Sequence, residues 1–178
     1  MIRQTHISFC LKRGLLSAGF LLILLMSSKL AHAQQPPAPP RPLAVYVNPA
    51  QGLIFGAFFL GNSGGSVILY PDGSRSTTGS IIQANLGYPF SPAIFEVDAN
   101  PGTQISILNG PDVTLTGSNG GSVQLHIGAA STGASFMSTA LPPARTQVRI
   151  GGTLIIGPPL ANPAGSYSGS FSVTFIQE

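Results

Sequence analysis

The chain has 178 residues, with eight Lys or Arg, five Asp or Glu and a single cysteine. Four of the basic residues and the cysteine lie in residues 1–33, so residues 34–178 carry four arginines against five carboxylates, a net charge of −1. A nearly neutral, cysteine-free chain of this length suits one domain with its own core. It excludes disulfides, thiolate metal sites and a strongly basic nucleic-acid surface.

The N-terminus has the layout of an export signal. Arg3, Lys12 and Arg13 form a basic start, residues 15–26 form an apolar stretch, and residues 31–33 (AHA) give an A-x-A cleavage pattern. The apolar stretch is shorter than the roughly 20 residues that span a bilayer, which disfavours the alternative of an uncleaved anchor. We therefore predict a cleavable signal helix over residues 1–33, with membrane contact only during export. The mature protein would lie in the periplasm, on the outer surface or outside the cell.

Residues 34–42 (QQPPAPPRP) form a proline-rich spacer that we expect to be extended and exposed. Beyond it, apolar and β-branched stretches alternate with clusters of Gly, Pro, Asn and Ser, a spacing typical of an all-β sandwich. No stretch after the signal has a helical apolar period with caps. We predict a single domain over residues 43–178, an all-β sandwich of roughly eight to ten strands. The first expected strand begins at residues 43–47, is interrupted by Asn48-Pro49 and resumes at 53–59. The others cover residues 66–70, 80–86, 93–99, 103–108, 113–116, 122–127, 134–140, 147–156 and 165–176.

Glycine-containing segments between and within the expected strands predict turns and one irregularity. Residues 61–65 (GNSGG) predict a turn, 71–74 (PDGS) a β-turn, and 100–102 (NPG) a short hairpin-like connection. The sequence of residues 61–67 (GNSGGSV) is similar to that of residues 117–123 (GSNGGSV). The similarity could come from duplication of half of the domain, but we favour two glycine turns that arose separately. The pair Gly151-Gly152 inside a strand predicts a bulge or a close backbone approach.

The last strand has the clearest alternation in the chain. Tyr167, Phe171, Val173 and Phe175 share one parity, while Ser and Thr occupy the other. Because side chains alternate across a strand, this pattern makes one apolar and one polar face.

One serine motif invites a hydrolase interpretation. Residues 61–65 match G-x-S-x-G around Ser63, and Asp98, Asp112 and His126 follow in the serine–acid–histidine order of α/β-hydrolases. That nucleophile elbow needs a helix after the serine, but Ser63 precedes a strand pattern. We therefore interpret the motif as a glycine turn and predict no catalytic residue.

The remaining polar residues predict an ordinary surface. His126 shares its parity with Gln124 and should face solvent, where a lone imidazole is a poor metal site. Glu96 and Asp98 share one strand face and could serve glycoside hydrolysis or calcium binding, but no Trp is present, so we favour a solvated face. Arg145 and Arg149 are interpreted as surface charges.

The C-terminal half resembles a known bacterial family. The ending of the domain-of-unknown-function 4402 family (DUF4402) resembles residues 148–154 (VRIGGTL) and 165–174 (GSYSGSFSVT). Three earlier segments, at 53–56, 65–69 and 92–97, also resemble this family, so the resemblance spans residues 43–178. That family is similar to fimbrial subunits and adhesin domains of Gram-negative bacteria, which are exported immunoglobulin-like, pilin-like sandwiches. The resemblance implies a groove, left by a missing strand, that a chaperone strand and then the next subunit fill.

We therefore expect an exported, non-enzymatic structural or adhesive cell-surface protein, a fimbria-like subunit that assembles by strand addition. Its partners would be identical or related subunits and a periplasmic chaperone, without a cofactor, metal or nucleic acid. The expected assembly edge consists of Tyr167, Phe171, Val173 and Phe175, together with residues 43–47. The alternative is a monomeric secreted or periplasmic binding module that uses glycine-rich loops.

Overall fold

The computed structural model describes residues 41–47 and 51–178. Contacts divide the chain into two units, Met1–Pro39 and Pro40–Glu178, and every described residue belongs to the second. The predicted signal helix and most of the proline-rich spacer lie outside the described residues and stay predictions. Within residues 41–47 and 51–178, no helix is both long enough and apolar enough to cross a membrane.

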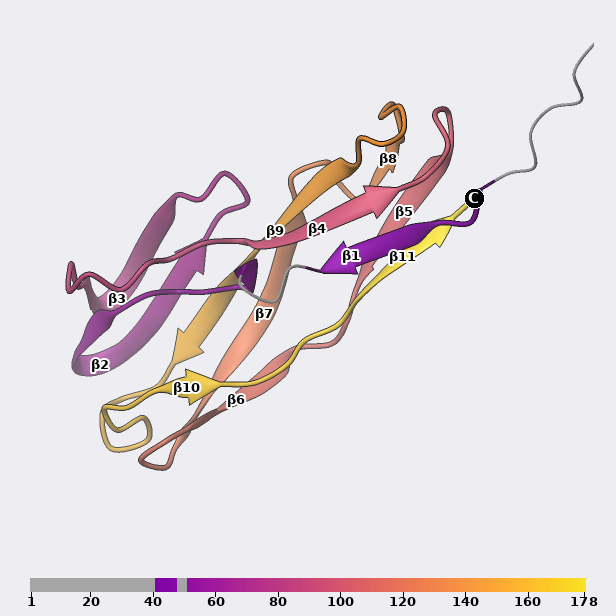
Figure 1. Cartoon of the computed structure of the whole chain (residues 1–178). Coiled ribbons are helices and arrows are strands. Elements are labelled where there is room, and N and C mark those ends of the chain that lie inside the picture. Colours follow the sequence, from indigo (N-terminus) through magenta and orange to yellow (C-terminus); the bar gives the residue numbers. More distant parts are fainter. Residues whose placement is uncertain (1–40, 48–50) are drawn as a thin grey trace, which may run out of the picture. The chain divides into compact units, whose positions relative to one another are not determined.

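The described part of the chain is all-β, as predicted, and contains eleven strands in two sheets (Figure 1). The larger sheet has the order β1-β4-β9-β7-β6-β10, with β2 pairing β9 and β3 pairing β2. The smaller sheet has the order β11-β5-β8. The strands are β1 (Ala44–Val47), β2 (Phe58–Leu69), β3 (Arg75–Gln83), β4 (Ala93–Asp98), β5 (Gln104–Asn109), β6 (Val113–Gly117), β7 (Ser122–Ala130), β8 (Ser135–Met137), β9 (Thr146–Ile156), β10 (Tyr167–Ser168) and β11 (Val173–Gln177).

Strand β9 is the centre of the larger sheet. Its first half pairs with β4, its second half pairs with β2, and β7 pairs along its other side. The change from β2 to β4 occurs at Gly151, where an added Cβ would lie 2.2 Å from the carbonyl oxygen of Leu69. The β7–β9 register also shifts here, between Ile127 and Ala130. The predicted bulge or close backbone approach at the glycine pair is confirmed.

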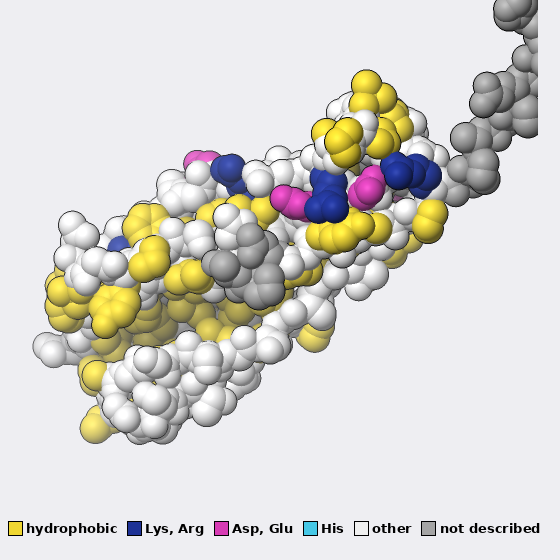
Figure 2. All heavy atoms as spheres, in the orientation of Figure 1, with side chains coloured by type: hydrophobic (Ala, Val, Ile, Leu, Met, Phe, Trp, Pro, Cys, Tyr) yellow, Lys and Arg dark blue, Asp and Glu magenta, His cyan; other side chains and the backbone are white. Residues whose placement is uncertain are grey.

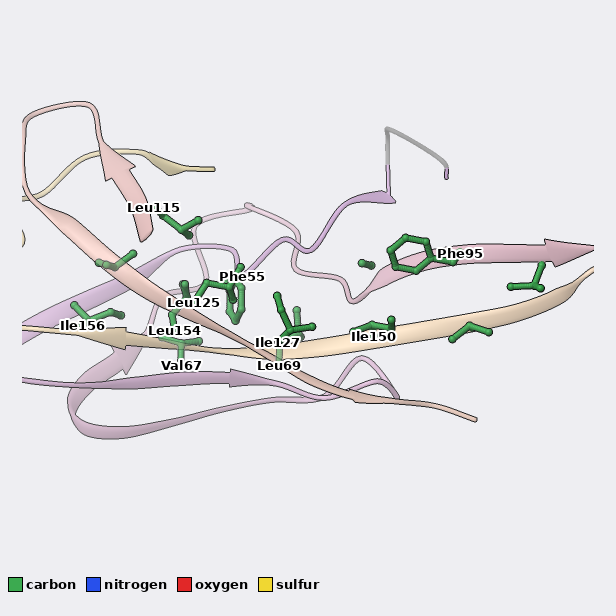
Figure 3. Close-up of a cluster of buried hydrophobic side chains, with 14 of the residues drawn as sticks. Phe55, Val67, Leu69, Phe95, Leu115, Leu125, Ile127, Ile150, Leu154 and Ile156 are labelled. Carbon is green, nitrogen blue, oxygen red and sulfur yellow. The ribbon is translucent and has the colours of Figure 1, made fainter. Parts of the chain in front are cut away.

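The two sheets enclose one apolar core. Alternate residues of β4, β7 and β9 are buried, as expected for strands with one dry face. Figure 3 shows side chains from β2, β4, β6, β7 and β9 gathering around Phe55, which precedes β2. The smaller sheet packs on the other side, with the Phe175 ring of β11 5.5 Å from the Phe95 ring of β4, centroid to centroid.

Three local predictions were wrong. Residues 61–65 are not a turn but part of β2, which stays paired with β3 through a register shift between Leu60 and Gly65. Residues 53–57 are not a strand and make a single bridge, between Ile54 and Ser91. The turn at residues 100–102 is not a hairpin, because it links β4 in one sheet to β5 in the other.

The two similar glycine segments have different structures. The first lies within β2, whereas the second forms the β6–β7 hairpin turn, with positive φ at Gly120 and Gly121. They therefore do not occupy equivalent places in two halves of the fold, and separate origins remain the better interpretation.

Candidate functional site

The predicted terminal strand is divided between the two sheets. Tyr167 of β10 pairs with Gly117 of β6, and Val173 of β11 pairs with Asn109 of β5. Between them, residues 169–172 carry the chain from the larger sheet to the smaller one (Figure 1). A close contact fixes this transition, since the Gly110 N–H donates to the Ser172 carbonyl at 2.9 Å.

All four predicted edge residues lie on this divided strand and contact the core. Each of them is only partly buried and packs against the buried cluster. The inward positions of β4, β7 and β9 are fully buried. The core is therefore covered along those three strands and more exposed to solvent along residues 167–175. The four residues are Tyr167, Phe171, Val173 and Phe175.

Both parts of this strand lie at a sheet edge, since β10 ends the larger sheet and β11 ends the smaller one. In an antiparallel pair, residue pairs that exchange main-chain hydrogen bonds alternate with pairs that do not. Ser172 accepts from Gly110, and Glu178 donates to Gln104, so the even-numbered residues of β11 bond to β5. The main-chain N–H and C=O groups at residues 173, 175 and 177 therefore point away from β5.

Strand β1 is an edge strand with an uncovered inner face. Val45 pairs with Val97 and Val47 pairs with Phe95. Directly opposed residues project from the same face of a sheet, so both valines face the core side. Val97 and Phe95 are 1% and 8% exposed, whereas Val45 and Val47 are 38% and 60% exposed. Inward apolar side chains on this edge thus lack the cover that their partners have.

We call the side of the sandwich between these two edges the seam. It is bordered by β1 and residues 51–57 on one side and by residues 167–177 on the other. Figure 2 shows a hollow with hydrophobic side chains in the part of the seam beside β10. The partly buried apolar residues along the seam are Leu43, Leu53, Tyr167, Phe171, Val173 and Phe175. The seam therefore combines an apolar hollow beside β10 with strands β1, β10 and β11, each of which ends its sheet among the described residues.

Arg75 holds the N-terminal border of the seam in place. Its Nη1 donates to the carbonyl oxygens of Phe55 at 2.6 Å and Ala57 at 3.3 Å. Gly56, between them, has a φ of +71°, and an added Cβ would lie 2.7 Å from that same Nη1. A side chain at residue 56 would therefore displace the guanidinium that donates to these two carbonyl oxygens.

Charged side chains link β1 and β4 on the outer face of the larger sheet. Arg145 Nη1 lies 2.9 Å from Glu96 Oε2, and its guanidinium lies 3.6 Å from the centroid of the Tyr46 ring. The hydrogen bond to Glu96 raises the pKa of Arg145 above its usual value. Asp98 lies 3.7 Å from Arg41. Figure 2 shows this cluster of charges. Glu96 and Asp98 thus each have their own arginine, and Arg145 does more than the plain surface charge we predicted.

The hydrolase arrangement is not assembled. His126 faces solvent, as predicted, and its Nδ1 lies 2.7 Å from Asp112 Oδ1. Ser63 is two strands away, because His126 pairs with Thr153 of β9, which in turn pairs with Ile68 of β2. Two strand spacings and the distance along β2 separate serine and histidine by more than about 15 Å. Ser63 instead exchanges hydrogen bonds with the Ser80 side chain.

The described residues contain no group of three or more His, Cys, Asp or Glu side chains that could hold a metal ion. The His126–Asp112 pair was missed from the sequence. Asp112 lies between two strands that belong to different sheets, so neither alternation nor spacing in the sequence indicates that it reaches β7.

A family model matches residues 45–176, and its description reads "Domain of unknown function (DUF4402)". The matched range covers both borders of the seam except for Ala44 and Gln177 at their ends. No curated protein and no solved structure matches the chain.

Proposed function

The chain belongs to the DUF4402 family, and from that premise we propose that it is an exported structural or adhesive cell-surface subunit that assembles by strand addition at the seam. The occupant of the seam is an extended strand of an identical or related subunit, preceded during export by a strand of a periplasmic chaperone. In this role the protein is not an enzyme.

One observation carries the proposal: the seam combines a free strand edge with uncovered inward apolar side chains. The edge at residues 173, 175 and 177 offers main-chain donors and acceptors to a partner strand. Val45 and Val47 on the opposite border offer apolar surface to the side chains of that strand. Strand addition uses these two elements, since main-chain pairing gives affinity and pockets for alternate side chains give register.

The export signal supports the same proposal. Residues 1–33 combine a basic start, an apolar stretch and a cleavage pattern, which is the layout of a signal for export from the cytoplasm. An exported chain would meet the chaperone and the other subunits in the periplasm. The proline-rich spacer at residues 34–42 is ill suited to the donor role, because proline lacks the N–H that a ladder requires. We therefore assign the donor strand to another segment or another subunit.

A second candidate function has its own observation. A cleft of about 570 Å³ lies between the β2–β3 turn, the end of β7 and the start of β9, lined by Tyr70, Pro71, Asp72, Ala130, Ser131, Gln147 and Arg149. Its volume is within the range of small-molecule sites. A monomeric secreted binding module would use this cleft and would have no need of an open seam.

Assembly of the mature protein separates the two functions. Protein purified from the periplasm is expected to form ladders or filaments on size exclusion and non-denaturing gels. A double variant, Phe171→Ser with Phe175→Ser, should lose these species while remaining folded by circular dichroism. Thr174→Ala, on the exposed face of the same strand, is the matched control. A wild-type protein that is monomeric in every extract, alone and with its chaperone, would overturn strand addition.

A further inference from the structure

Exposed apolar side chains gather at the end of the sandwich where β3 leads into β4. Figure 2 shows hydrophobic side chains at this end. Single exposed apolar residues need no explanation, but a contiguous group of large ones marks a surface that binds something. The group consists of Phe59 (55% exposed), Ile82 (64%), Leu86 (58%), Tyr88 (67%) and Phe90 (41%).

A pocket of about 300 Å³ opens within this group. It is lined by Arg75, Gln83, Ala84, Asn85, Tyr88 and Phe90. Two aromatic rings, two carboxamides and one guanidinium thus converge on a volume at the lower end of the ligand-site range. Such a size suits a single ring with polar substituents.

The walls of this pocket are fixed by backbone contacts. Ile54 and Ser91 exchange two main-chain hydrogen bonds, and the Ala84 N–H donates to Ala57 at 3.2 Å. An added Cβ on Gly56 would lie 3.2 Å from the Pro89 carbonyl, so the loop packs directly on bare backbone. Gln83 is also oriented, because its Nε2 donates to the Arg75 carbonyl at 3.1 Å. The pocket is therefore preformed, which lowers the entropic cost of binding.

The charge in the pocket is uncompensated among the described residues. The guanidinium of Arg75 lies 4.3 Å from the centroid of the Phe90 ring, and its Nε is buried without a hydrogen-bond partner. No ion pair between described residues includes Arg75, and no acidic side chain lines the pocket. An arginine without a carboxylate partner attracts an anionic group by its charge, even though Arg75 Nη1 already donates to the Phe55 and Ala57 carbonyls.

We propose that this pocket binds a sugar residue that carries a carboxylate, such as a uronic acid at the end of a glycan. The ring of Tyr88 stacks on the C–H face of the sugar, as an exposed amphipathic ring does at binding surfaces. The carboxamides of Gln83 and Asn85 supply a donor and acceptors for hydroxyl groups. Arg75 attracts the carboxylate. This site adjoins the seam, because Arg75 also donates to the Phe55 and Ala57 carbonyls of the seam border, but none of the four predicted edge residues lines the pocket.

The test is an NMR titration of the folded mature protein with methyl glucuronide and with methyl glucoside, its neutral counterpart. The glucuronide is expected to shift the amide signals of residues 83–90, with an affinity about tenfold above that of the glucoside. Tyr88→Ala and Asn85→Asp should each weaken glucuronide binding by about tenfold, the first by removing the stacking ring and the second by adding a repelling charge.

Tyr70→Ala is the matched control, because Tyr70 is an exposed tyrosine, 43% accessible, in the other cleft. It should leave binding unchanged. Absence of glucuronide-dependent shifts at residues 83–90, equal affinity for the two sugars, or unchanged binding by Tyr88→Ala would each overturn the proposal. Shifts that move instead with Tyr70→Ala would also overturn it, since they would place the sugar in the larger cleft.

Discussion

Replacing Phe175 with serine should separate the stability of the sandwich from its assembly. Truncating a fully buried phenylalanine costs about 3–5 kcal/mol. Phe175 is partly buried and contacts Phe95, so we expect a loss of about 2 kcal/mol in the free energy of unfolding. A phenylalanine buries roughly 200 Å², and a partner strand that covers a further ~50 Å² gains about 1.3 kcal/mol, or about tenfold in affinity.

Ile107→Ser is the matched control for this variant. Ile107 pairs directly with Phe175, is also partly buried, and lies in β5, between β11 and β8. Both variants should lower the midpoint of urea unfolding by a similar amount, but only Phe175→Ser should reduce the yield of assembled species on non-denaturing gels. Equal assembly by the two variants, or equal loss of it, would refute the reasoning, because the effect would then follow stability and not the seam.

Three further predictions test other features. Gln177→Pro should block assembly with little change in melting temperature, because it removes an N–H that points away from β5, whereas Ile176→Pro should lower the melting temperature by breaking a bond to β5. Gly151→Ala should lower the free energy of unfolding by about 3 kcal/mol in urea titrations, since its Cβ would meet the Leu69 carbonyl at 2.2 Å; wild-type stability would contradict the close approach. The Ser74 hydroxyl, followed by the Ser74 N–H, lowers the pKa of Asp72 below 3.8, so the stabilising effect of this turn is present above pH 3.8 and is lost as the pH falls through the lower, folded-state value. Ser74→Ala should raise the Asp72 midpoint in an NMR titration, and an unchanged midpoint would exclude the hydroxyl as the main cause.

The strands that obey strict alternation within one sheet could be predicted from the sequence. Residues 93–99 and 147–156 were expected as strands and correspond closely to β4 (Ala93–Asp98) and β9 (Thr146–Ile156). The solvent-facing position of His126 was also predictable, because its neighbours Leu125 and Ile127 share the buried parity. In these cases the pattern of burial follows directly from the two-residue period of a strand.

The glycine segment at residues 61–65 could not be assigned from local chemistry. Its composition is typical of a turn, yet the absence of side chains also lets neighbouring strands approach closely. An added Cβ on Gly64 would lie 2.2 Å from the Ile156 carbonyl, and one on Gly65 would lie 2.2 Å from that of Thr78. Tertiary pairing with β3 and β9 thus decides between turn and bulged strand, and no local signal reports that pairing.

The seam itself was only partly predictable. Alternation identified the apolar residues of the last strand, but it continues unbroken through residues 169–172, where the chain changes sheets. The exposure of Val45 and Val47 depends on which strands face them, which is a property of the folded sandwich. The sequence therefore indicated residues of both borders, at 43–47 and 167–175, and the three-dimensional arrangement was needed to show that these residues border one seam.

The central position of β9 constrains when the sandwich can fold. Gly65 of β2 pairs with Ile156, and Val97 of β4 pairs with Thr146, so two early strands depend on one that is made late. Pairings so distant in sequence form slowly, because loop closure must precede the contacts that stabilise it. A chain that emerges from the membrane N-terminus first would expose the edges of β2 and β4 until residues 146–156 arrive. For a chain exported as we propose, this topology would require protection of those edges during translocation, whatever later occupies the seam.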